Sequence, residues 1–369
     1  MKIVLVIGTR PNFMKVAPIA AELRRRSSEF TVRIVHTGQH YDYTMSAVFL
    51  SELGLQDPDH YLKASVESGR VGQVADIMSK FDTVLETERP ELVMVVGDVS
   101  STLACATTAA LRDLPLAHVE AGLRSGDRRL PEELYRIATD AFADMLFTYS
   151  ADADANLVAE RVPTSSIFRV GNVMIDALVQ MLPAAERSGI VEQLGLQAGQ
   201  YAVATLHRQS NVEDETTLRG IMEAFGQIQQ RIPLVFQVHP RTRQSLERFG
   251  LYGEVAAMPG ITLQDPMGYI DFLKLQKDAR MALVDSGGIQ EETTVLGVPC
   301  LTLRESTERP ITVTEGTNTI VGCDRDNIVA AAEKVLDGGG KSGAIPELWD
   351  GHSAGRLVDV LANHGVSRR

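Results

Sequence analysis

Short runs of β-branched and aliphatic residues alternate with longer amphipathic segments along the chain. A strand buried on both faces of a parallel sheet is continuously apolar, whereas a surface helix repeats its apolar residues every three to four positions. The alternation predicts α/β architecture with doubly wound parallel sheets. We expect strands at residues 2–8, 31–36, 91–96, 114–118, 144–148, 201–205, 233–238, 261–263, 280–284 and 299–303. We expect helices at residues 14–26, 43–53, 70–88, 101–112, 132–143, 151–160, 214–230, 241–249, 268–277, 288–296, 325–337 and 353–363.

The alternation weakens at residues 180–198, a charged stretch with glycine and proline, and then restarts. A chain of 369 residues is too long for one ordinary core. We therefore predict two Rossmann-like domains, residues 1–180 and 181–369, with a cleft between them and a last helix able to pack back on the first domain. In such sheets ligands bind beyond the carboxyl ends of the strands, so a functional motif should directly follow a strand.

The net charge of −12 argues against a nucleic-acid or anionic-membrane partner. The apolar run at residues 2–8 is too short for a signal peptide or membrane span, so we expect a cytoplasmic protein. Cys105, Cys300 and Cys323 are widely spaced and predict reduced thiols. No His, Cys or Asp spacing is typical of a metal site, and we predict no metal.

In the first domain, Gly8-Thr9-Arg10-Pro11 follows a strand and precedes a helix that carries Lys15. A helix N-terminus with two cations suits a phosphate or carboxylate. A plain turn with a helix cap explains the motif equally well.

Acidic residues follow two later strands of this domain and begin the next helix. Asp98 and Glu120 come after strands, and Glu132 opens a helix with Arg136 one turn further on. Each acid alone is more often a helix cap or a partner of the helix dipole. Three of them at one sheet edge favour acid–base chemistry.

The second domain repeats the pattern with histidines and glycines. His207 and His239 each follow a strand, with arginines next to them, and suit a charged substrate. The sequence Ser286-Gly287-Gly288 joins a strand to a helix and presents backbone N–H groups to a diphosphate. Glu292 on that helix could accept hydrogen bonds from a ribose. Arg309 follows the next strand.

Together these motifs resemble those of the non-hydrolysing UDP-N-acetylglucosamine 2-epimerases of bacteria and archaea. The resemblance covers nearly the whole chain and rests on GTRPNFMKVAP, TGQH, GDVSST, HVEAGLRSGD, PEE, GNVMIDAL, LHR, DSGGIQEE and TERP. It implies a glycosyltransferase-B architecture, a homodimer, and no cofactor. The implied reaction eliminates UDP across C1–C2, gives a 2-acetamidoglucal, and adds UDP back with C2 inverted, interconverting UDP-N-acetylglucosamine and UDP-N-acetylmannosamine.

The resemblance also implies a role for each matching residue. The catalytic group is Asp98, Glu120, Glu132 and His207. The residues that bind the substrate are Arg10, His239, Ser286, Gly287 and Gly288 at the diphosphate, Glu292 at the ribose, and Lys15, Arg136 and Arg309 in supporting contacts.

The chain departs from the family at Val99-Ser100-Ser101, at Gln209-Ser210-Asn211 and at Tyr41-Asp42. The last two lie in regions that form an activating second UDP-N-acetylglucosamine site in bacterial relatives. These departures leave that site and the substituents at C3 and C6 of the sugar open. UDP-2,3-diacetamido-2,3-dideoxy-glucuronic acid is the alternative substrate. A glycosyltransferase and a non-catalytic UDP-sugar sensor are the rival functions.

Overall fold

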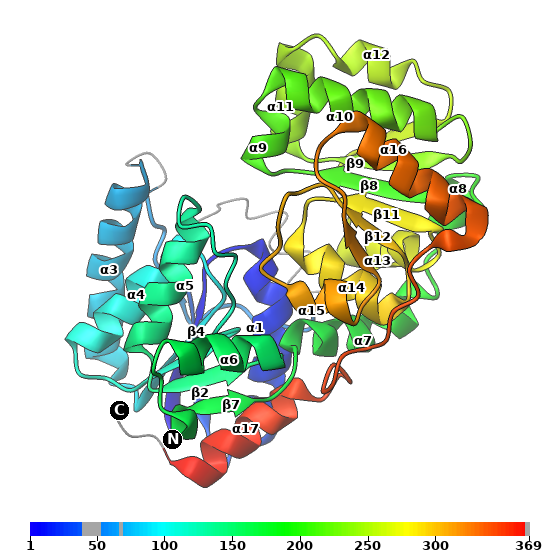
Figure 1. The fold of residues 1–369 in the computed structure, drawn as a ribbon. Helices are drawn as coiled ribbons and strands as arrows, with labels where there is room; N and C mark the ends of the chain where they lie inside the picture. Colours follow the sequence, from blue (N-terminus) through cyan, green and yellow to red (C-terminus); the bar gives the residue numbers. More distant parts are fainter. Residues whose placement is uncertain (39–52, 66–68, 366–369) are drawn as a thin grey trace. The chain divides into compact units, whose positions relative to one another are not determined.

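The computed structural model describes residues 1–38, 53–65 and 69–365. It divides into two compact units, which Figure 1 colours along the chain. Unit 1 consists of Met1–Gln180 and Glu347–Arg369, and unit 2 consists of Met181–Pro346. Each unit is built on a parallel sheet with helices on both faces, so the expected doubly wound α/β fold is confirmed.

Unit 1 contains a parallel sheet in the order β3-β2-β1-β4-β5-β6-β7. Its strands are β1 (Lys2–Ile7), β2 (Thr31–His36), β3 (His60–Tyr61), β4 (Leu92–Val96), β5 (Leu116–Val119), β6 (Met145–Thr148) and β7 (Ile167–Arg169). Its helices are α1 (Arg10–Arg25), α3 (Gly69–Glu88), α4 (Ser100–Leu111), α5 (Pro131–Phe142), α6 (Ala151–Ala159), the 3-10 turn η1 (Thr164–Ser166), α7 (Val173–Ala185) and, from the end of the chain, α17 (Ser353–His364).

Unit 2 contains a parallel sheet in the order β10-β9-β8-β11-β12-β13. Its strands are β8 (Ala202–Leu206), β9 (Leu234–Val238), β10 (Ile261–Gln264), β11 (Met281–Val284), β12 (Cys300–Thr302) and β13 (Asn318–Ile320). Its helices are α8 (Ile190–Gln193), α9 (Gln209–Val212), α10 (Glu215–Ile228), α11 (Pro240–Arg248), α12 (Tyr252–Ala256), α13 (Tyr269–Lys277), α14 (Gly287–Leu296), α15 (Pro310–Thr314), α16 (Arg325–Lys334) and the π-helical turn η2 (Val335–Gly339).

Both sheets have a point at which the strand order reverses. The first strand of each unit lies inside the sheet, the next strands are added on one side, and the chain then crosses to the other side. The reversal falls between β1 and β4 in unit 1 and between β8 and β11 in unit 2. At such a switch point the loops leave in opposite directions, and this is where open α/β sheets bind ligands.

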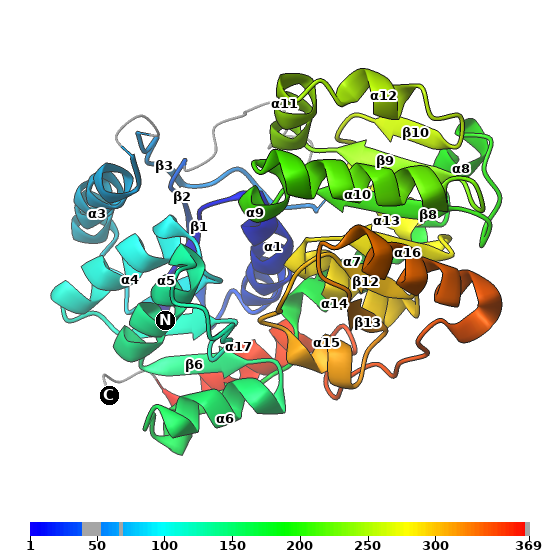
Figure 2. The same ribbon diagram turned by 45° about the horizontal axis from the view of Figure 1, so that its top comes forward.

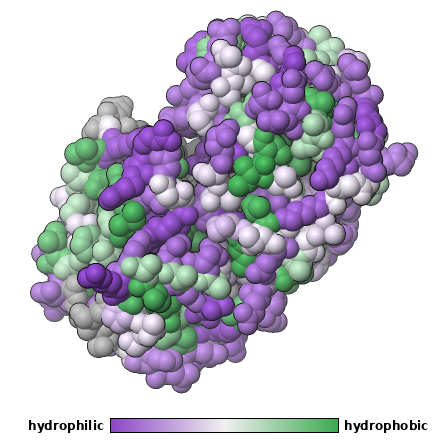
Figure 3. All heavy atoms as spheres, in the orientation of Figure 1, coloured by the Kyte–Doolittle hydropathy of each residue, from purple (hydrophilic) through white to green (hydrophobic). Residues whose placement is uncertain are grey.

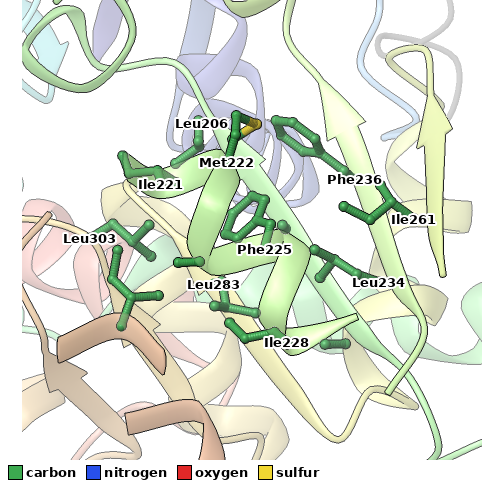
Figure 4. Close-up of a cluster of buried hydrophobic side chains, with 14 of the residues drawn as sticks. Leu206, Ile221, Met222, Phe225, Ile228, Leu234, Phe236, Ile261, Leu283 and Leu303 are labelled. Carbon is green, nitrogen blue, oxygen red and sulfur yellow. The ribbon is translucent and has the colours of Figure 1, made fainter. Parts of the chain in front are cut away.

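The core of unit 2 shows how strand periodicity divides the sheet. Leu206 and Phe236 point to a cluster with α10, whereas Val203 and Val235 point to the opposite cluster with α13 and α14. Figure 4 shows Phe225 of α10 inside the first cluster, with its ring edge-on to Phe236 at 5.5 Å. On that face α10 and α16 lie side by side (Figures 1 and 2). Successive strand residues face opposite sides of the sheet, and helices cover both sides. Both faces of each inner strand are therefore apolar, as the sequence pattern predicted.

The end of the chain is fastened to unit 1 by specific polar contacts. The indole of Trp349 donates to the carbonyl of Tyr149 at 3.0 Å and packs edge-on against its ring. The carboxylate of Asp176 accepts from the backbone N–H groups of Ser353 and Ala354, at 3.0 and 2.6 Å, and thereby caps α17. These contacts explain the GNVMIDAL motif, whose aspartate is Asp176, as an anchor for the returning chain.

Two expectations from the sequence are wrong in detail. The linker expected at residues 180–198 is helical at its start, because α7 continues to Ala185 and buries Met181 and Ala185 on one stripe. Pro183 does not end this helix. The loop expected before residue 14 is also shorter, since α1 begins at Arg10 with a proline in its first turn. The helix expected at 43–53 and the Tyr41-Asp42 departure fall outside the described residues.

The face visible in Figure 3 is largely hydrophilic, with hydrophobic residues in small separate groups. None of the described helices is long and apolar enough to cross a membrane.

The cap on α17 leads to a stability prediction. Asp176→Ala leaves two buried N–H groups without their acceptor, so we expect the free energy of unfolding to fall by about 1–3 kcal/mol. Urea denaturation followed by circular dichroism measures this change. The control is Asp359→Ala on the same helix, whose side chain is mostly exposed and pairs with Arg26, and which should cost less than about 0.5 kcal/mol. Equal effects of the two variants would contradict the capping role.

Candidate active site

The predicted motifs of unit 1 lie at its switch point. The turn after β1 holds Gly8 and Thr9, and the turn after β4 holds Gly97 and Asp98. Asn12 ties them together, because its Oδ1 accepts from the backbone N–H groups of Gly8 and Thr9 at 3.1 and 2.9 Å while its Nδ2 donates to the carbonyl of Val96 at 3.1 Å. Arg10, the first residue of α1, lies at the positive end of the helix dipole.

Lys15 and Glu120 form a buried ion pair beside these turns. Lys15 Nζ lies 2.5 Å from Glu120 Oε2, and both side chains are more than 90% buried. The other oxygen, Glu120 Oε1, is buried and has no hydrogen-bond partner among the described residues. Glu120 also has a left-handed backbone, with φ +68°. A non-glycine residue in this region carries strain, which is typical of functional sites.

Asp98 is held by Arg136 from α5. The Arg136 Nε and Nη2 atoms lie 2.9 and 2.6 Å from Asp98 Oδ2, and its Nη1 lies 2.6 Å from Glu133. Asp98 is not the cap of α4, because the N-cap position is Val99. Its side chain is about a quarter exposed. The arginine therefore fixes the carboxylate of Asp98 at an accessible strand end.

The two glutamates that open α5 differ in their surroundings. Glu132, predicted as catalytic, is half-buried, and no hydrogen bond joins its side chain to another described residue. Glu133 is buried and accepts from the N–H groups of Ser125 and Gly126, each at 2.9 Å. Burial opposes ionisation of Glu133, but these bonds and Arg136 lower its pKa below the ordinary value. Glu133 thus organises the loop before α5.

A histidine that the sequence did not single out connects the acidic turns. His118 of β5 is fully buried, with Nδ1 2.6 Å from Asp140 of α5 and Nε2 2.9 Å from the carbonyl of Gly97. Asp140 also accepts from the N–H of Gly122, just after Glu120, at 3.1 Å. Burial opposes ionisation of Asp140, but His118 and Arg124 lower its pKa. This pair links the Asp98 turn, the Glu120 turn and α5.

In unit 2, the switch point brings His207 to Asp285. His207 follows β8 and Asp285 follows β11, and His207 Nδ1 lies 3.0 Å from Asp285 Oδ1. The ring of His239, after β9, lies 5.8 Å from that of His207. His239 itself caps α11, because its Nδ1 accepts from the N–H of Arg241 at 3.2 Å. Both predicted histidines therefore lie at the same sheet edge.

The Ser286-Gly287-Gly288 sequence forms the start of α14. Ser286 is the N-cap but makes no capping hydrogen bond with its side chain, so the first-turn N–H groups are not capped by it. A Cβ on Gly287 would lie 2.7 Å from Arg309 Cζ, so the glycine makes room for that guanidinium. Arg309 is buried and lies 2.9 Å from Glu291, with Glu308 also in contact. A helix N-terminus beside a fixed arginine suits an anion.

Glu292 is held in the interior of unit 2. Its Oε1 accepts from the Tyr269 hydroxyl and its Oε2 from Gln276 Nε2, both at 2.9 Å. Burial raises the pKa of Glu292 to about 7, even though the two hydrogen bonds act in the opposite direction. Each carboxyl oxygen can accept a second hydrogen bond, so a ribose hydroxyl remains a compatible partner.

Several residues at these turns have no counterpart in the sequence-based prediction. They are Asn12, His118, Glu133, Asp140, Asp285 and Glu291. For Asp285 a signal existed, since it directly precedes the Ser-Gly-Gly turn. In the part of the chain that the structure describes, no group of three or more His, Cys, Asp or Glu side chains could hold a metal ion.

Comparison with known proteins agrees with this geometry. The model of the UDP-N-acetylglucosamine 2-epimerase family matches residues 21–362. The chain belongs to this family. The UDP-N-acetylglucosamine 2-epimerase of Methanocaldococcus jannaschii is 38% identical over 98% of this chain and 99% of its own. Its crystal structure in complex with UDP-GlcNAc and UDP matches with a TM-score of 0.89, at 36% identity, over 98% of this chain and 99% of that one.

Two further matches concern the sugar substrate and the fold. The UDP-2,3-diacetamido-2,3-dideoxy-D-glucuronate 2-epimerase of Pseudomonas aeruginosa is 39% identical over 91% of this chain and 92% of its own. A lipopolysaccharide outer core galactosyltransferase is only 12% identical but has a TM-score of 0.58 over 99% of this chain and 100% of that one. This last likeness concerns the fold alone, which is the expected glycosyltransferase-B type.

The environment of Glu292 predicts a pH dependence of stability. The folded-state pKa of about 7 lies above the ordinary value of 4.5, so folding takes up a proton between these values. The free energy of unfolding should therefore fall, by on the order of 2 kcal/mol, as the pH rises from about 5 to about 8. In Glu292→Gln this fall in the free energy of unfolding with pH should be missing. Urea denaturation at a series of pH values measures it, with Glu333→Gln at an exposed position of α16 as the control. Parallel curves for the parent and Glu292→Gln would refute the assignment.

Proposed function

We propose that this protein catalyses the reversible C2 epimerisation of UDP-N-acetylglucosamine to UDP-N-acetylmannosamine, by elimination and re-addition of UDP through a 2-acetamidoglucal. Membership of the epimerase family supports the reaction. The observation that carries the mechanism is the buried Glu120, which has one oxygen on Lys15 and the other without a partner among the described residues. A carboxylate in this state is ready to interact with a substrate.

The chemistry of the sugar determines which groups the reaction requires. The C2–H of the substrate is not next to a carbonyl, so removing this proton depends on departure of the diphosphate at C1. The protein must accept a proton at C2 and stabilise negative charge on the leaving group. For return on the opposite face, a second group must deliver a proton to C2. At least two acid–base groups are therefore required.

Unit 1 supplies these groups in the proposed mechanism. Asp98 and Glu120 follow neighbouring parallel strands, β4 and β5, and so lie at the same sheet edge. Arg136 pairs with Asp98 and Lys15 with Glu120, so each proposed proton acceptor has a cation beside it. Glu132 completes the predicted set, and Arg10 is proposed to contact the diphosphate.

Unit 2 supplies the binding of UDP. The start of α14 at Ser286, Gly287 and Gly288, which the Ser286 side chain does not cap, is proposed to hold the diphosphate, with Arg309 in a supporting contact. His207 and His239 lie at the same sheet edge and are proposed to contact the phosphates. His207 is proposed to donate a proton to the diphosphate as it leaves and to accept one as it adds back. Glu292 is proposed to accept from the ribose hydroxyls.

The proposal has two further parts that follow the family resemblance. We infer that the protein acts as a homodimer and works in the cytoplasm, where nucleotide sugars are made. Analytical ultracentrifugation tests the first statement and cell fractionation the second.

A second substrate is supported by the relative from Pseudomonas aeruginosa, which is as similar to this chain as the archaeal epimerases. That enzyme is named for a 2,3-diacetamido-2,3-dideoxy-glucuronate, which differs from N-acetylglucosamine at C3 and C6. Both UDP sugars therefore belong in the same assay.

Incubation of each UDP sugar with the protein in heavy water, without an acceptor, tests the reaction. We expect the gluco and manno forms to reach equilibrium and one deuteron to enter at C2, because the proton exchanges while the glycal is bound. Proton NMR follows both events. Free N-acetylmannosamine in stoichiometric amounts would place the protein among the hydrolysing enzymes. Product without deuterium at C2 would exclude elimination at C2, and binding without turnover would indicate a sensor.

Asp98→Asn tests the acid–base role. The change keeps the size of the side chain but removes a proton acceptor, so we expect kcat to fall about a hundredfold or more. The affinity for UDP, measured by calorimetry, should stay within about threefold, because UDP is proposed to bind unit 2. Asp359→Asn on the exposed face of α17 serves as the matched control. A kcat of Asp98→Asn near that of the parent would show that Asp98 is only a structural partner of Arg136.

A further inference from the structure

We propose that Asp285 is a positioning residue that fixes the ring of His207 with a proton on Nδ1 and leaves Nε2 to act on the substrate. This inference rests on the proposed role of His207, and it concerns unit 2 alone. It adds a function to a residue whose other contacts are with two backbone N–H groups and Asn211.

Four nitrogen atoms of one short segment surround Asp285: three are hydrogen-bond donors, and the fourth, Nδ1 of His207, is in ion-pair contact. Its Oδ1 lies 3.0 Å from His207 Nδ1 and 3.1 Å from the backbone nitrogen of His207. Its Oδ2 accepts from the backbone N–H of Arg208 at 2.9 Å and from Asn211 Nδ2 at 3.2 Å, and also lies 3.1 Å from the His207 nitrogen. The carboxylate is fully buried. It is therefore a fixed acceptor for the turn that carries His207.

The charge of Asp285 is maintained in spite of its burial. Desolvation would raise its pKa, but the contacts with His207 and the backbone N–H group of Arg208 lower it below the ordinary value. An ionised carboxylate can only accept hydrogen bonds. The proton between Asp285 and the ring must therefore lie on Nδ1 of His207.

This geometry determines what the other ring nitrogen can do. When the ring is neutral and Nδ1 carries the proton, Nε2 has a free lone pair and can take up a proton. The adjacent carboxylate also stabilises the imidazolium that results, as in triads that combine an acid, a histidine and a reacting group. Nε2 has no hydrogen bond to a described residue, and the side chain is about one-third exposed. His207 is thus oriented to take a proton from the diphosphate as UDP adds back, and the resulting imidazolium can return that proton to the diphosphate oxygen when UDP is eliminated.

Asp285 also connects this histidine to the diphosphate-binding turn. It is the last residue before Ser286, the N-cap of α14. The same residue therefore sets the position of His207 on β8 and the start of the helix after β11. A purely structural Asp285 would need only the two backbone N–H groups and Asn211. The additional contact with Nδ1 is the feature that a structural role leaves unexplained.

Asp285→Asn tests the proposal because it predicts a change of tautomer. The amide oxygen is expected to stay with the Arg208 and Asn211 donors, which places the amide NH2 against Nδ1 of His207. A donor at this position requires an unprotonated Nδ1, so the neutral ring should switch to the Nε2–H form. Nε2 could then no longer accept a proton. We expect kcat to fall about a hundredfold or more, with KM and the affinity for UDP within about threefold of the parent.

Long-range proton–nitrogen NMR on protein labelled with 15N-histidine reads the tautomer directly. The chain has eight histidines, and His207→Gln identifies the signal of His207. The parent should show Nδ1–H for the neutral ring, and Asp285→Asn should show Nε2–H. The matched control is Asp176→Asn, which also alters a buried carboxylate that accepts two backbone N–H groups. It should leave both the His207 tautomer and kcat unchanged.

The outcomes separate this proposal from the proposed function. Nε2–H in the parent would overturn the positioning role, even in an active enzyme. If Asp285→Asn does not fold, the tautomer of the parent alone decides. A loss of kcat in Asp285→Asn without a change of tautomer would also overturn it. If the parent shows the expected tautomers but no epimerisation, the positioning of His207 stands and the proposed reaction fails.

Discussion

Parallel strands all end at the same edge of a sheet, and the reversal of strand order leaves one point on that edge where loops diverge. In unit 1 this point brings together the turns after β1 and β4, and in unit 2 those after β8 and β11. Gly8, Asp98, His207 and Ser286 occupy these turns. The winding of the chain, rather than any single motif, therefore decides which distant residues become neighbours.

Charged groups at such a point are close to the apolar sheet and lose much of their hydration. Glu133, Asp140 and Asp285 meet this cost by accepting hydrogen bonds from neighbouring turns. The bonds of Asp140 and Asp285 also tie together residues 18 and 77 positions apart in the sequence. The requirement to solvate buried carboxylates thus fixes the turns relative to one another within each unit, and so gives the reactive groups defined positions.

The sequence was sufficient for the parts of this arrangement that depend on local pattern. Strand periodicity predicted the longer strands of both sheets but not the short edge strands β3, β7 and β13. The position of Asp98, Glu120, His207 and Ser286 after a strand could be read from the sequence. The prediction of a linker from residue 180 was wrong because α7, with its apolar stripe, continues past Gln180 and Pro183. The partners His118, Asp140 and Asp285 were missed for a different reason. Their roles depend on contacts between residues 22 and 78 positions apart, which no local spacing reveals.

Hydrogen bonding distinguishes the acids that build the site from one that is free to react. Asp140 and Asp285 have partners on both oxygens, so they have little capacity left for a substrate. Glu120 is buried as deeply, yet its Oε1 lacks a partner among the described residues, and its backbone is strained. A buried acceptor without a partner costs about 1–3 kcal/mol. The fold tolerates this cost and the strain at the same residue, at the edge where the chain brings its other acids. Glu120 therefore keeps one acceptor oxygen open to a ligand, which is what the proposed acid–base role on a sugar requires.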